Sequence, residues 1–288
     1  MSWNLRKKLT RKIGGISRIN LKSGAVQNLQ KIANQLRIIA LEMICEANSG
    51  HPGGSLSAMD ILVALYFGGI LKHNPKKPED PKRDFFILSK GHASAALYAV
   101  LAERGFFLKK ELAKFRQINS ILQGHPTPQT LGVEVATGSL GQGLSFSVGL
   151  ALAKSKQHIF TLLGDGELQE GQVWEAAMSA SHFKLGNLTA IVDHNSLQID
   201  GSNSEVMNVA PIADKFKSFG WNVVEIDGHN FTEILRELRK AKTAQKPTVI
   251  VAKTVKGKGA PCAENNFAYH GVPLSVEEMQ ETRKNLVE

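Results

Sequence analysis

The chain has 288 residues, of which 42% are hydrophobic and 21% are charged, a balance typical of a globular protein with one large domain or two small ones. The longest apolar run, residues 61–71, contains Gly68 and Gly69 and is too short to span a bilayer. No apolar core follows the basic start, which argues against a secretory signal peptide, so we expect a cytoplasmic protein whose Cys45 and Cys262 are free thiols.

The formal net charge of +9 belongs to one end of the chain. Of the 35 Lys and Arg residues, nine lie in residues 1–41, which hold no Asp or Glu, so the remainder balances 26 basic against 26 acidic residues. We interpret residues 1–24 as a solvated basic arm; contact with an acidic partner surface and a transit peptide are the alternatives. Nucleic-acid binding is not expected, because no aromatic-studded basic groove accompanies the arm.

Two helices are predicted after the arm. The first has one apolar face with three- and four-residue spacing and ends near Asn48-Ser49-Gly50; the face comprises Leu29, Ile32, Leu36, Ile39 and Met43. His51-Pro52-Gly53-Gly54 is expected to form a tight loop. The second helix is predicted to start at Ser57, since Asp60 three residues later completes a capping-box pattern.

Strands and helices then alternate. The predicted strands are residues 85–88, 158–163, 188–192, 222–226 and 248–252, and the predicted helices between them are residues 93–104, 168–183 and 232–242. A polar loop, residues 73–83, precedes the first strand. This alternation predicts an α/β fold with a parallel sheet that carries helices on both faces.

The central chemical signal is Gly164-Asp165-Gly166, followed one helix later by Asn195. Both segments come directly after apolar strands, at the edge where open parallel sheets bind ligands. The glycines allow a close approach to phosphate. A carboxylate, an amide oxygen and a nearby carbonyl suit Mg²⁺, with Ca²⁺ or Mn²⁺ as alternatives, bridging to a diphosphate. A helix opening at Glu167-Leu168 would add a favourable dipole for the anion.

Gly164-Asp165-Gly166 through Asn195 resembles the signature of enzymes that use thiamine diphosphate. The longer string GDGELQEGQVWEAAMSASHFKLGNLTAIVDHNSLQIDG resembles transketolases in particular. Five more blocks occur in the order of that family: NSGHPGGSLSAMDILVALY, LSKGHASAALYAVLAERG, GHPT, GVEVATGSLGQGLSFSVGLALA and AYHGVPL. Together they span about residues 26–276. The resemblance implies the thiamine-diphosphate-binding fold, with residues 25–288 as the domain that binds the diphosphate.

The resemblance also implies residue roles. The metal would be held by the side chains of Asp165 and Asn195 and by the carbonyl of Leu197. The residues implied to contact the cofactor are His92, Gly138, Leu140, Gly164, Asp165, Gly166, Glu170, Asn195, Leu197 and His270, and Glu170 would also lie at the interface between the two halves of the site.

Four histidines are implied to act in catalysis. His51 and His125 would contact sugar hydroxyls, and His92 and His270 would lie near the diphosphate and the reacting end of the cofactor. Histidine suits proton transfer on hydroxyls and alkoxides, because it titrates near neutral pH. The other histidines are assigned no role: His73, His158, His182, His194 and His229.

Two residues depart from the family pattern. Ser139 stands where the family usually has proline, so the loop there is expected to be looser. Glu167 stands where a small or sulfur-containing residue is common, and it would place an extra negative charge near the diphosphate unless its side chain points away.

The resemblance finally implies a partner. Transketolases continue with a pyrimidine-binding and a C-terminal domain, which hold the activating glutamate and most of the sugar-phosphate contacts. We therefore expect this chain to be the N-terminal subunit of a split transketolase that acts on sugar phosphates in an α2β2 assembly. The alternatives are a related thiamine-diphosphate enzyme for an unusual ketose phosphate or a 2-oxo acid, and a non-catalytic cofactor-binding remnant.

Overall fold

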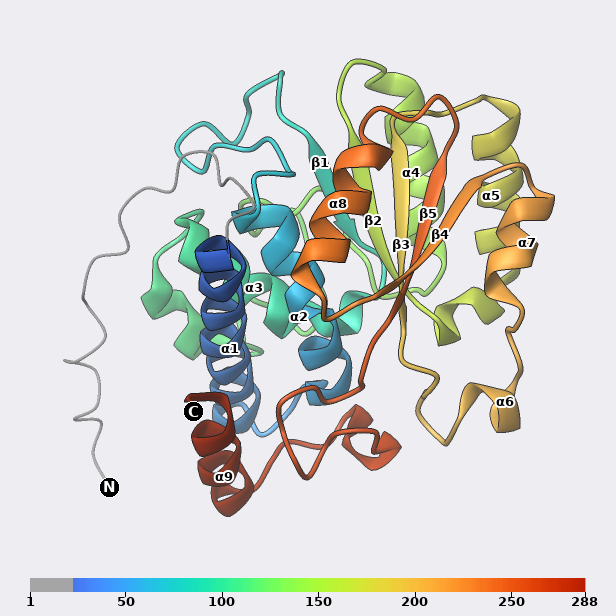
Figure 1. The fold of residues 1–288 in the computed structure, drawn as a ribbon. Helices are drawn as coiled ribbons and strands as arrows, with labels where there is room; N and C mark the ends of the chain where they lie inside the picture. Colours follow the sequence, from blue (N-terminus) through green and yellow to red (C-terminus); the bar gives the residue numbers. More distant parts are fainter. Residues whose placement is uncertain (1–22, 288) are drawn as a thin grey trace.

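The computed structural model describes residues 23–287 (Figure 1). The part of the basic arm up to residue 22 lies outside the described residues. The strands are β1 (Phe85–Leu88), β2 (Ile159–Gly164), β3 (Leu188–His194), β4 (Asn222–Asp227) and β5 (Thr248–Lys253). The helices are α1 (Ser23–Glu46), α2 (Pro52–Phe67), α3 (Ser94–Arg104), α4 (Gln142–Ala153), α5 (Gly171–His182), α6 (Asn203–Val206), α7 (Ile212–Ser218), α8 (Phe231–Ala241) and α9 (Val276–Val287). Short 3₁₀ segments are η2 (Gly91–Ala93), η3 (Lys109–Lys114), η4 (Gly166–Gln169) and η5 (Phe267–His270).

The five strands form one parallel sheet in the order β1-β2-β3-β5-β4. The register pairs Gly164 of β2 with Asp193 of β3, and His194 of β3 with Lys253 of β5. The carboxyl ends of neighbouring strands are therefore level at one edge. The predicted α/β fold with a parallel sheet is confirmed, and all five predicted strands are present within one or two residues of their predicted ends.

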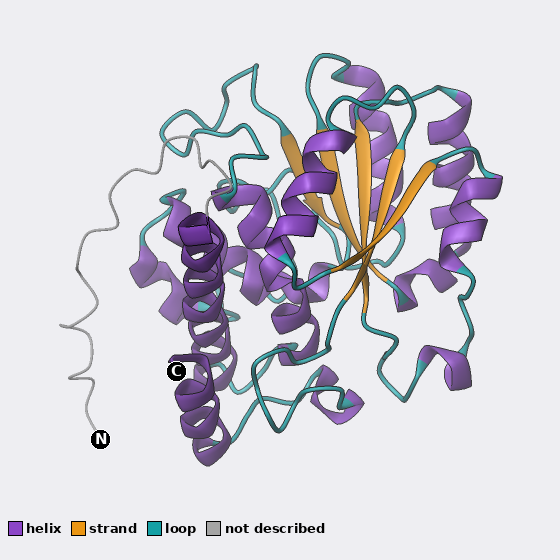
Figure 2. Ribbon diagram, viewed as in Figure 1, coloured by secondary structure: helices purple, strands orange, loops and turns teal. Residues whose placement is uncertain are grey.

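Helices cover both faces of the sheet (Figure 2). Strand side chains alternate between them, so Phe160 and Leu162 pack with α1, α2, α3 and α8, whereas Ile159 and Leu163 pack with α4, α5 and α7. Full burial of one such side chain stabilises the fold by about 1.5–3 kcal/mol. A smaller cluster joins α9 and the segment before it to α1, with Leu41 and Met279 among its members.

The predicted apolar face of α1 is confirmed, since Leu29, Ile32, Leu36 and Met43 are buried and Ile39 packs against the same core. The predicted start of the second helix is wrong. Helix α2 begins at Pro52, with His51 as its N-cap residue, so the expected loop is the first helical turn and Ser57 lies inside the helix.

Tertiary contacts explain this difference. Ser57 and Asp60, which looked like a capping box, turn instead to other elements: the Ser57 hydroxyl donates to Asp193, and Asp60 forms a bidentate ion pair with Arg37. The two glycines in the first turn allow close packing, because a Cβ at Gly53 would lie 3.0 Å from the Lys256 side chain and one at Gly54 would lie 3.0 Å from His92 Nε2.

The helix predicted from Leu168 also starts later than expected. Residues Gly166–Gln169 form the 3₁₀ segment η4, and α5 begins at Gly171 with Glu170 as its N-cap residue. The dipole expected from a helix opening at Glu167-Leu168 therefore does not exist at that position. None of the helices within residues 23–287 has the length and apolar character needed to cross a membrane.

Candidate functional site

The loops after β2 and β3 meet at the carboxyl edge of the sheet, toward the lower end of the molecule in Figure 1. Asp165 follows β2, and its Oδ2 accepts a hydrogen bond from the Ser196 backbone N–H at 2.5 Å, while its Oδ1 accepts from the Gly166 N–H at 2.9 Å. Its own N–H donates to the Asp193 carbonyl at 3.2 Å. These bonds hold Asp165 beside the segment that carries Asn195 and Leu197.

Asn195 and Leu197 form the other side of this junction. The Asn195 side-chain oxygen accepts a hydrogen bond from the Leu197 N–H at 3.1 Å. The Leu197 carbonyl in turn accepts one from Lys256 Nζ at 3.3 Å. Ser196 between them has a left-handed φ of 64°, which turns the chain sharply. The Asn195 amide oxygen and the Leu197 carbonyl therefore lie in one tight turn, and the Asp165 carboxylate from the loop after β2 is bonded to the same turn through Ser196.

Asp165 is almost fully buried, and burial together with the neighbouring Asp193 raises the pKa of its carboxyl. Burial also opposes ionisation of Asp193, but the charge of Lys90 and hydrogen bonds from Lys90, Ser57 and Thr254 outweigh it and lower the pKa of Asp193. The negative charge of Asp193 is thus balanced by Lys90 within the fold. Asp165 has no ion-pair partner among residues 23–287, which leaves a carboxylate suited to a cation.

Four histidines gather at the same edge from four separate segments. His51 lies at their centre, with its ring centroid 5.3 Å from that of His92, 5.4 Å from that of His270 and 6.4 Å from that of His125. His92 and His270 are 5.4 Å apart. The structure therefore places together the four residues that the sequence analysis selected from blocks far apart in the chain.

The surroundings of all four rings favour the neutral imidazole over the protonated form. Burial, and after it the charges of Arg116 or of nearby lysines, lowers the pKa of His51 to about 4 and that of His270 to about 3. The pKa of His92 lies well below its usual value because of burial and Lys90, and that of His125 is lowered by burial and Arg116. Neutral imidazoles can each donate one hydrogen bond and accept another.

Two buried lysines were missed by the sequence analysis. Lys90, 1% exposed, donates to Asp193 and to the Gly54 carbonyl at 3.0 Å. Lys256, 2% exposed, donates to the Leu197 carbonyl and contacts His270 Nδ1 at 2.9 Å. Burial and then the charge of Lys90 lower the pKa of Lys256 to about 8. The available signal was a lysine next to a glycine just after a buried strand, since that position is at the ligand-binding edge.

Glu167 points away from the junction of Asp165 and Asn195. Its buried carboxylate accepts hydrogen bonds from the Ser89 hydroxyl, from the Gly141 N–H at 2.8 Å and from the Gly164 N–H at 3.0 Å. Burial raises the pKa of this carboxyl, and the three donors oppose that shift. Glu167 therefore connects the ends of β1 and β2 to the start of α4, instead of adding a charge to the open edge.

The loop before α4 holds two more of the predicted cofactor contacts. Gly138 has φ 144°, and a Cβ there would lie 3.0 Å from the His125 ring, so a side chain would displace this histidine. The Leu140 carbonyl accepts a hydrogen bond from Gln172 at 2.8 Å, and Ser139 beside it is exposed. Glu170, at the start of α5, is exposed.

The histidines without an assigned role lie in different surroundings. His158 contacts the Thr189 hydroxyl at the amino end of β2, His73 accepts a hydrogen bond from Arg104, and His229 contacts Asp60. His194, by contrast, lies close to the site. It is the last residue of β3, and its Nε2 lies 3.4 Å from the hydroxyl of Ser196, whose backbone N–H donates to Asp165.

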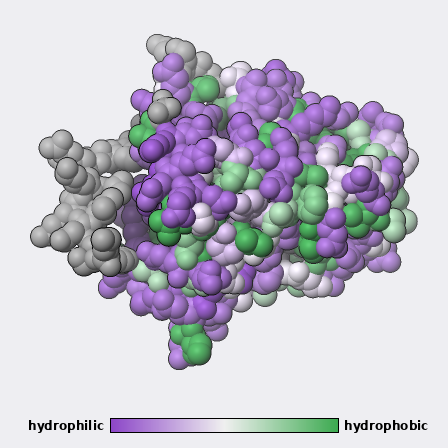
Figure 3. Space-filling model, turned by 90° about the horizontal axis from the view of Figure 1, so that it is seen from below, coloured by the Kyte–Doolittle hydropathy of each residue, from purple (hydrophilic) through white to green (hydrophobic). Residues whose placement is uncertain are grey.

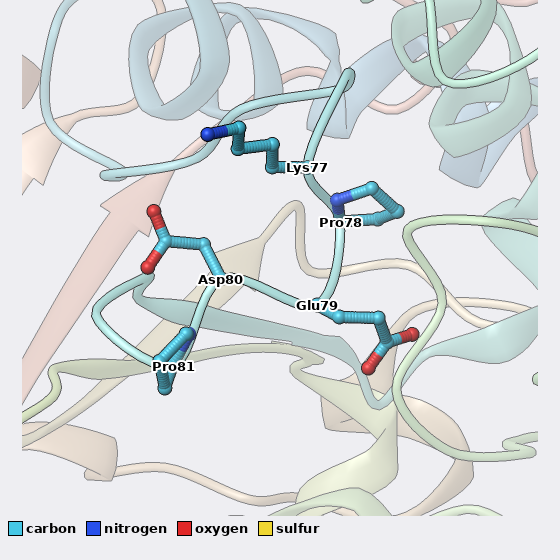
Figure 4. A pocket seen from close by; sticks show the side chains of 5 residues that line it. All are labelled: Lys77, Pro78, Glu79, Asp80 and Pro81. Carbon is cyan, nitrogen blue, oxygen red and sulfur yellow. The ribbon is translucent and has the colours of Figure 1, made fainter.

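A hollow of about 470 Å³ lies in the polar loop before β1, at the opposite edge of the sheet, and is lined by Lys77, Pro78, Glu79, Asp80 and Pro81 (Figure 4). Its side chains in Figure 4 spread away from one another and do not converge on a point. The end of the molecule with the histidines is mostly hydrophilic, with separate hydrophobic patches (Figure 3).

Exposed apolar side chains occur on α4 and α5. Phe146 is 48% exposed and Met178 is 58% exposed, and Leu152 and Phe183 are similarly open. These residues lie on the sides of the two helices that face away from the sheet, because Leu144, Val148, Val173 and Ala177 fill the core positions. Neighbouring exposed apolar residues on paired helices are typical of a protein–protein interface.

Comparison with known proteins identifies the kind of chain this is. A family model described as "Transketolase, thiamine diphosphate binding domain" matches residues 28–287. The 6-deoxy-6-sulfo-D-fructose transketolase subunit SqwG of Clostridium sp. (strain MSTE9) is 45% identical over 87% of this chain and 93% of its own length. One subunit of the apulose-4-phosphate transketolase of Phocaeicola vulgatus is 41% identical over 89% of this chain and 92% of its own length.

Longer proteins match over part of their length. Human transketolase is 41% identical over 86% of this chain and 40% of its own length. The crystal structure of transketolase from Campylobacter jejuni superposes with a TM-score of 0.86 at 40% identity, over 91% of this chain and 43% of that chain. The chain thus spans about two-fifths of these transketolases and nearly all of the two subunits named above.

Proposed function

This chain belongs to the transketolase family, and we propose that it is one subunit of a two-chain transketolase that transfers a two-carbon ketol unit from a ketose to an aldose. The observation that carries the proposal is the gathering of His51, His92, His125 and His270 at the sheet edge that also holds Asp165 and Asn195. Anion-binding groups and neutral proton-transfer groups then lie side by side, as the reaction requires.

The residues present fit thiamine diphosphate with a divalent metal. Asp165, the Asn195 side chain and the Leu197 carbonyl would hold the metal, and Gly164, Gly166, Asn195 and Lys256 would face the diphosphate. No three His, Cys, Asp or Glu side chains gather at metal-binding distances among residues 23–287. With Asp165, Asn195 and Leu197 as its protein ligands, a magnesium ion would draw its other oxygen ligands from the diphosphate and from water.

The remaining site residues have distinct tasks. Gly138 and Leu140 would lie against the cofactor rings, and Glu170 would meet the partner chain at the start of α5. When bound, thiamine diphosphate supplies the nucleophilic carbon and the electron sink for carbon–carbon cleavage. His51 and His125 would bind sugar hydroxyls and move protons on them, while His92 and His270 would do so nearer the diphosphate.

The proposal of a partner chain has two supports. Both relatives that this chain covers almost completely are named as subunits. The exposed apolar residues of α4 and α5, among them Phe146 and Met178, provide a surface for a second copy or for a chain with the pyrimidine-binding domain. An α2β2 assembly would bury such a surface in both copies of this chain.

The substrate is proposed only as a class. The two subunit relatives are named for 6-deoxy-6-sulfo-D-fructose and for apulose-4-phosphate, which share a ketose skeleton and an anionic group. We therefore propose an anionic ketose, a sugar phosphate in the first instance, as the donor.

The experiment is to purify this chain and a chain from the same genome that carries the pyrimidine-binding and C-terminal domains, and to assay ketol transfer with each alone and with both. We expect activity only from the mixture, dependent on thiamine diphosphate and Mg²⁺. Met178→Glu should weaken assembly, while Lys246→Glu, at an exposed position before β5, serves as a surface control. Robust activity from this chain alone would exclude the two-chain proposal, and cofactor binding without any turnover in the mixture would favour a non-catalytic role.

A further inference from the structure

Arg116 has a backbone conformation that is rare for its residue type. It follows η3 with φ 60°, in the left-handed region, and its N–H donates to the Leu122 carbonyl at 2.8 Å. Residues other than glycine take this conformation at a cost, and they keep it where surrounding contacts require it, often at functional sites. Here the turn directs the guanidinium toward the four histidines.

The guanidinium fits a slot between two loops of the site. Its Nη1 donates to the Ser49 hydroxyl at 2.9 Å, and its Nη2 lies 3.4 Å from His51 Nδ1. A Cβ at Gly124 would lie 2.9 Å from Arg116 Cζ, so only glycine leaves room for the guanidinium at that point. The slot thus joins the residues before α2 to the loop that carries His125.

The contact with His51 has a chemical consequence. An arginine side chain has only donors, so His51 Nδ1 must be the acceptor and the single proton of the neutral ring must reside on Nε2. The edge of the ring that bears Nε2 faces Gly271, because a Cβ on that glycine would be 4.0 Å from Nε2. The ring itself lies between His92 and His270, with centroids 5.3 and 5.4 Å away.

We propose that Arg116 is a positioning residue: it orients His51 and selects the tautomer that presents an Nε2–H donor to an oxygen of the ketose, without contacting the sugar itself. The identity of the acceptor as a ketose oxygen rests on the proposed function, whereas the tautomer rests only on the contact between Arg116 and His51. The two parts are therefore tested separately.

The tautomer is tested in the purified full-length chain, with no partner and no substrate. Nitrogen-15 NMR at pH 7 should show the His51 ring as a single Nε2–H tautomer in the wild type. In Arg116→Met we expect the two ring nitrogens to shift toward tautomer-averaged values. A wild-type Nδ1–H tautomer, or identical spectra in the variant, would overturn the proposal whatever the enzyme turns out to do.

The kinetic arm uses the active mixture of both chains. Arg116→Met should lower kcat/KM for the ketose about tenfold or more, with the affinity for thiamine diphosphate within about twofold of wild type. Gly124→Ala should have a similar effect, because its methyl group displaces the guanidinium while leaving the charge in the protein. Unchanged kcat/KM in Arg116→Met would refute the positioning role.

A double-mutant cycle separates this mechanism from a direct effect of Gly124→Ala on His125. If the alanine acts through Arg116, it adds nothing in the Arg116→Met background; full additivity would contradict the proposal. Arg104→Gln is the matched control, since Arg104 donates to His73 Nε2 at 2.9 Å at the other ends of α2 and α3. It should leave ketol transfer unchanged. An inactive wild-type mixture would argue against the proposed function and leave the NMR result standing.

Discussion

Lys256 donates a hydrogen bond from Nζ to the carbonyl oxygen of Leu197 at 3.3 Å, the same oxygen that we propose as a metal ligand. No carboxylate pairs with this ammonium group within residues 23–287, although the group is almost fully buried. A buried cation without a protein counter-ion is costly, and an anionic ligand removes that cost. Among residues 23–287, Lys256 therefore lacks an anionic partner and Asp165 lacks a cationic partner, and both lie at the same edge of the sheet.

Replacement of Lys256 tests whether this lysine binds the anionic diphosphate. Lys256→Met should weaken thiamine diphosphate binding about tenfold or more, because a charge-assisted hydrogen bond to a phosphate oxygen is lost. Titration calorimetry at saturating Mg²⁺ measures this directly. The control is Lys258→Met, a more exposed lysine that lies 3.5 Å from Glu264. Equal losses in both variants would mean that only net charge matters.

The metal side is tested at Asp165. Asp165→Ala should abolish Mg²⁺-dependent binding of thiamine diphosphate while the domain stays folded, since Asp165 lies in a loop at a strand end and not in the apolar core. Asp165→Asn keeps one acceptor oxygen, for either the Ser196 or the Gly166 amide, and loses the charge, so it should disturb the loop less than alanine does and still bind Mg²⁺ poorly. Calorimetry and melting curves together check both statements. Unchanged cofactor affinity in either variant would remove Asp165 from the site.

The substrate histidines are tested by separating turnover from cofactor binding. His51→Ala or His125→Ala should reduce kcat/KM for the ketose by about 100-fold, the usual scale of a positioned proton-transfer group. Affinity for thiamine diphosphate should stay within a few-fold, because neither ring contacts the Asp165 junction. Steady-state kinetics and calorimetry on the same preparations decide. A large loss of cofactor affinity would reassign these two residues to the diphosphate.

Glu167 yields a stability prediction. Its carboxylate accepts from three donors, and Glu167→Gln would turn an amide NH₂ toward at least one of them. We expect a loss of about 2–3 kcal/mol in the free energy of unfolding, since a buried donor is left unsatisfied. Urea unfolding measures it, with the exposed Glu170→Gln as the control. Equal stability of the two variants would show that the Glu167 bonds contribute nothing.

Buried neutral histidines predict a loss of stability in acid. Burial and then the charge of Lys242 lower the pKa of His158 to about 4, so between about pH 6.5 and pH 4 the unfolded chain binds a proton that the native chain does not. Stability therefore falls as the pH falls through that interval, by at most about 3 kcal/mol for this residue. His158→Gln keeps a polar contact to Thr189 without the titration. As the pH falls through this interval, the urea midpoint of His158→Gln should fall less than that of the wild type. If the two midpoints fall by the same amount, His158 does not contribute to the acid sensitivity.

Much of the architecture could be predicted from the chain's local pattern. Apolar runs such as residues 159–163 and 188–192 form buried strands wherever helices cover both faces, so their alternation with helices identifies a parallel sheet without any knowledge of contacts. Asp165 and Asn195 could be selected because each follows such a strand. Their proximity follows from the rule that carboxyl ends of parallel strands meet at one edge. The four histidines were selected by resemblance, and their roles stay predictions.

Other features depend on contacts between distant segments. Ser57 and Asp60 carry a local capping signal, yet α2 begins at Pro52, and the two side chains bind Asp193 and Arg37 instead of capping a helix. Lys256 and Glu167 show the same dependence. The position of Lys256 after a buried strand indicates the ligand-binding edge, but its neighbours do not reveal that no carboxylate pairs with it. The neighbours of Glu167 likewise do not reveal that its side chain turns inward to three donors.

The contact between Arg116 and His51 is the feature that local sequence patterns could predict least. The two residues are 65 positions apart and meet only after α2 and the loop beyond η3 have packed against the sheet edge. The hydrophobic period and the alternation of strands with helices depend on residues close in sequence, so both can be predicted from the chain, whereas the order of the strands in the sheet was not predicted. The direction of a buried polar side chain depends instead on which donors and acceptors the completed fold brings within hydrogen-bond reach, and that is decided only in three dimensions.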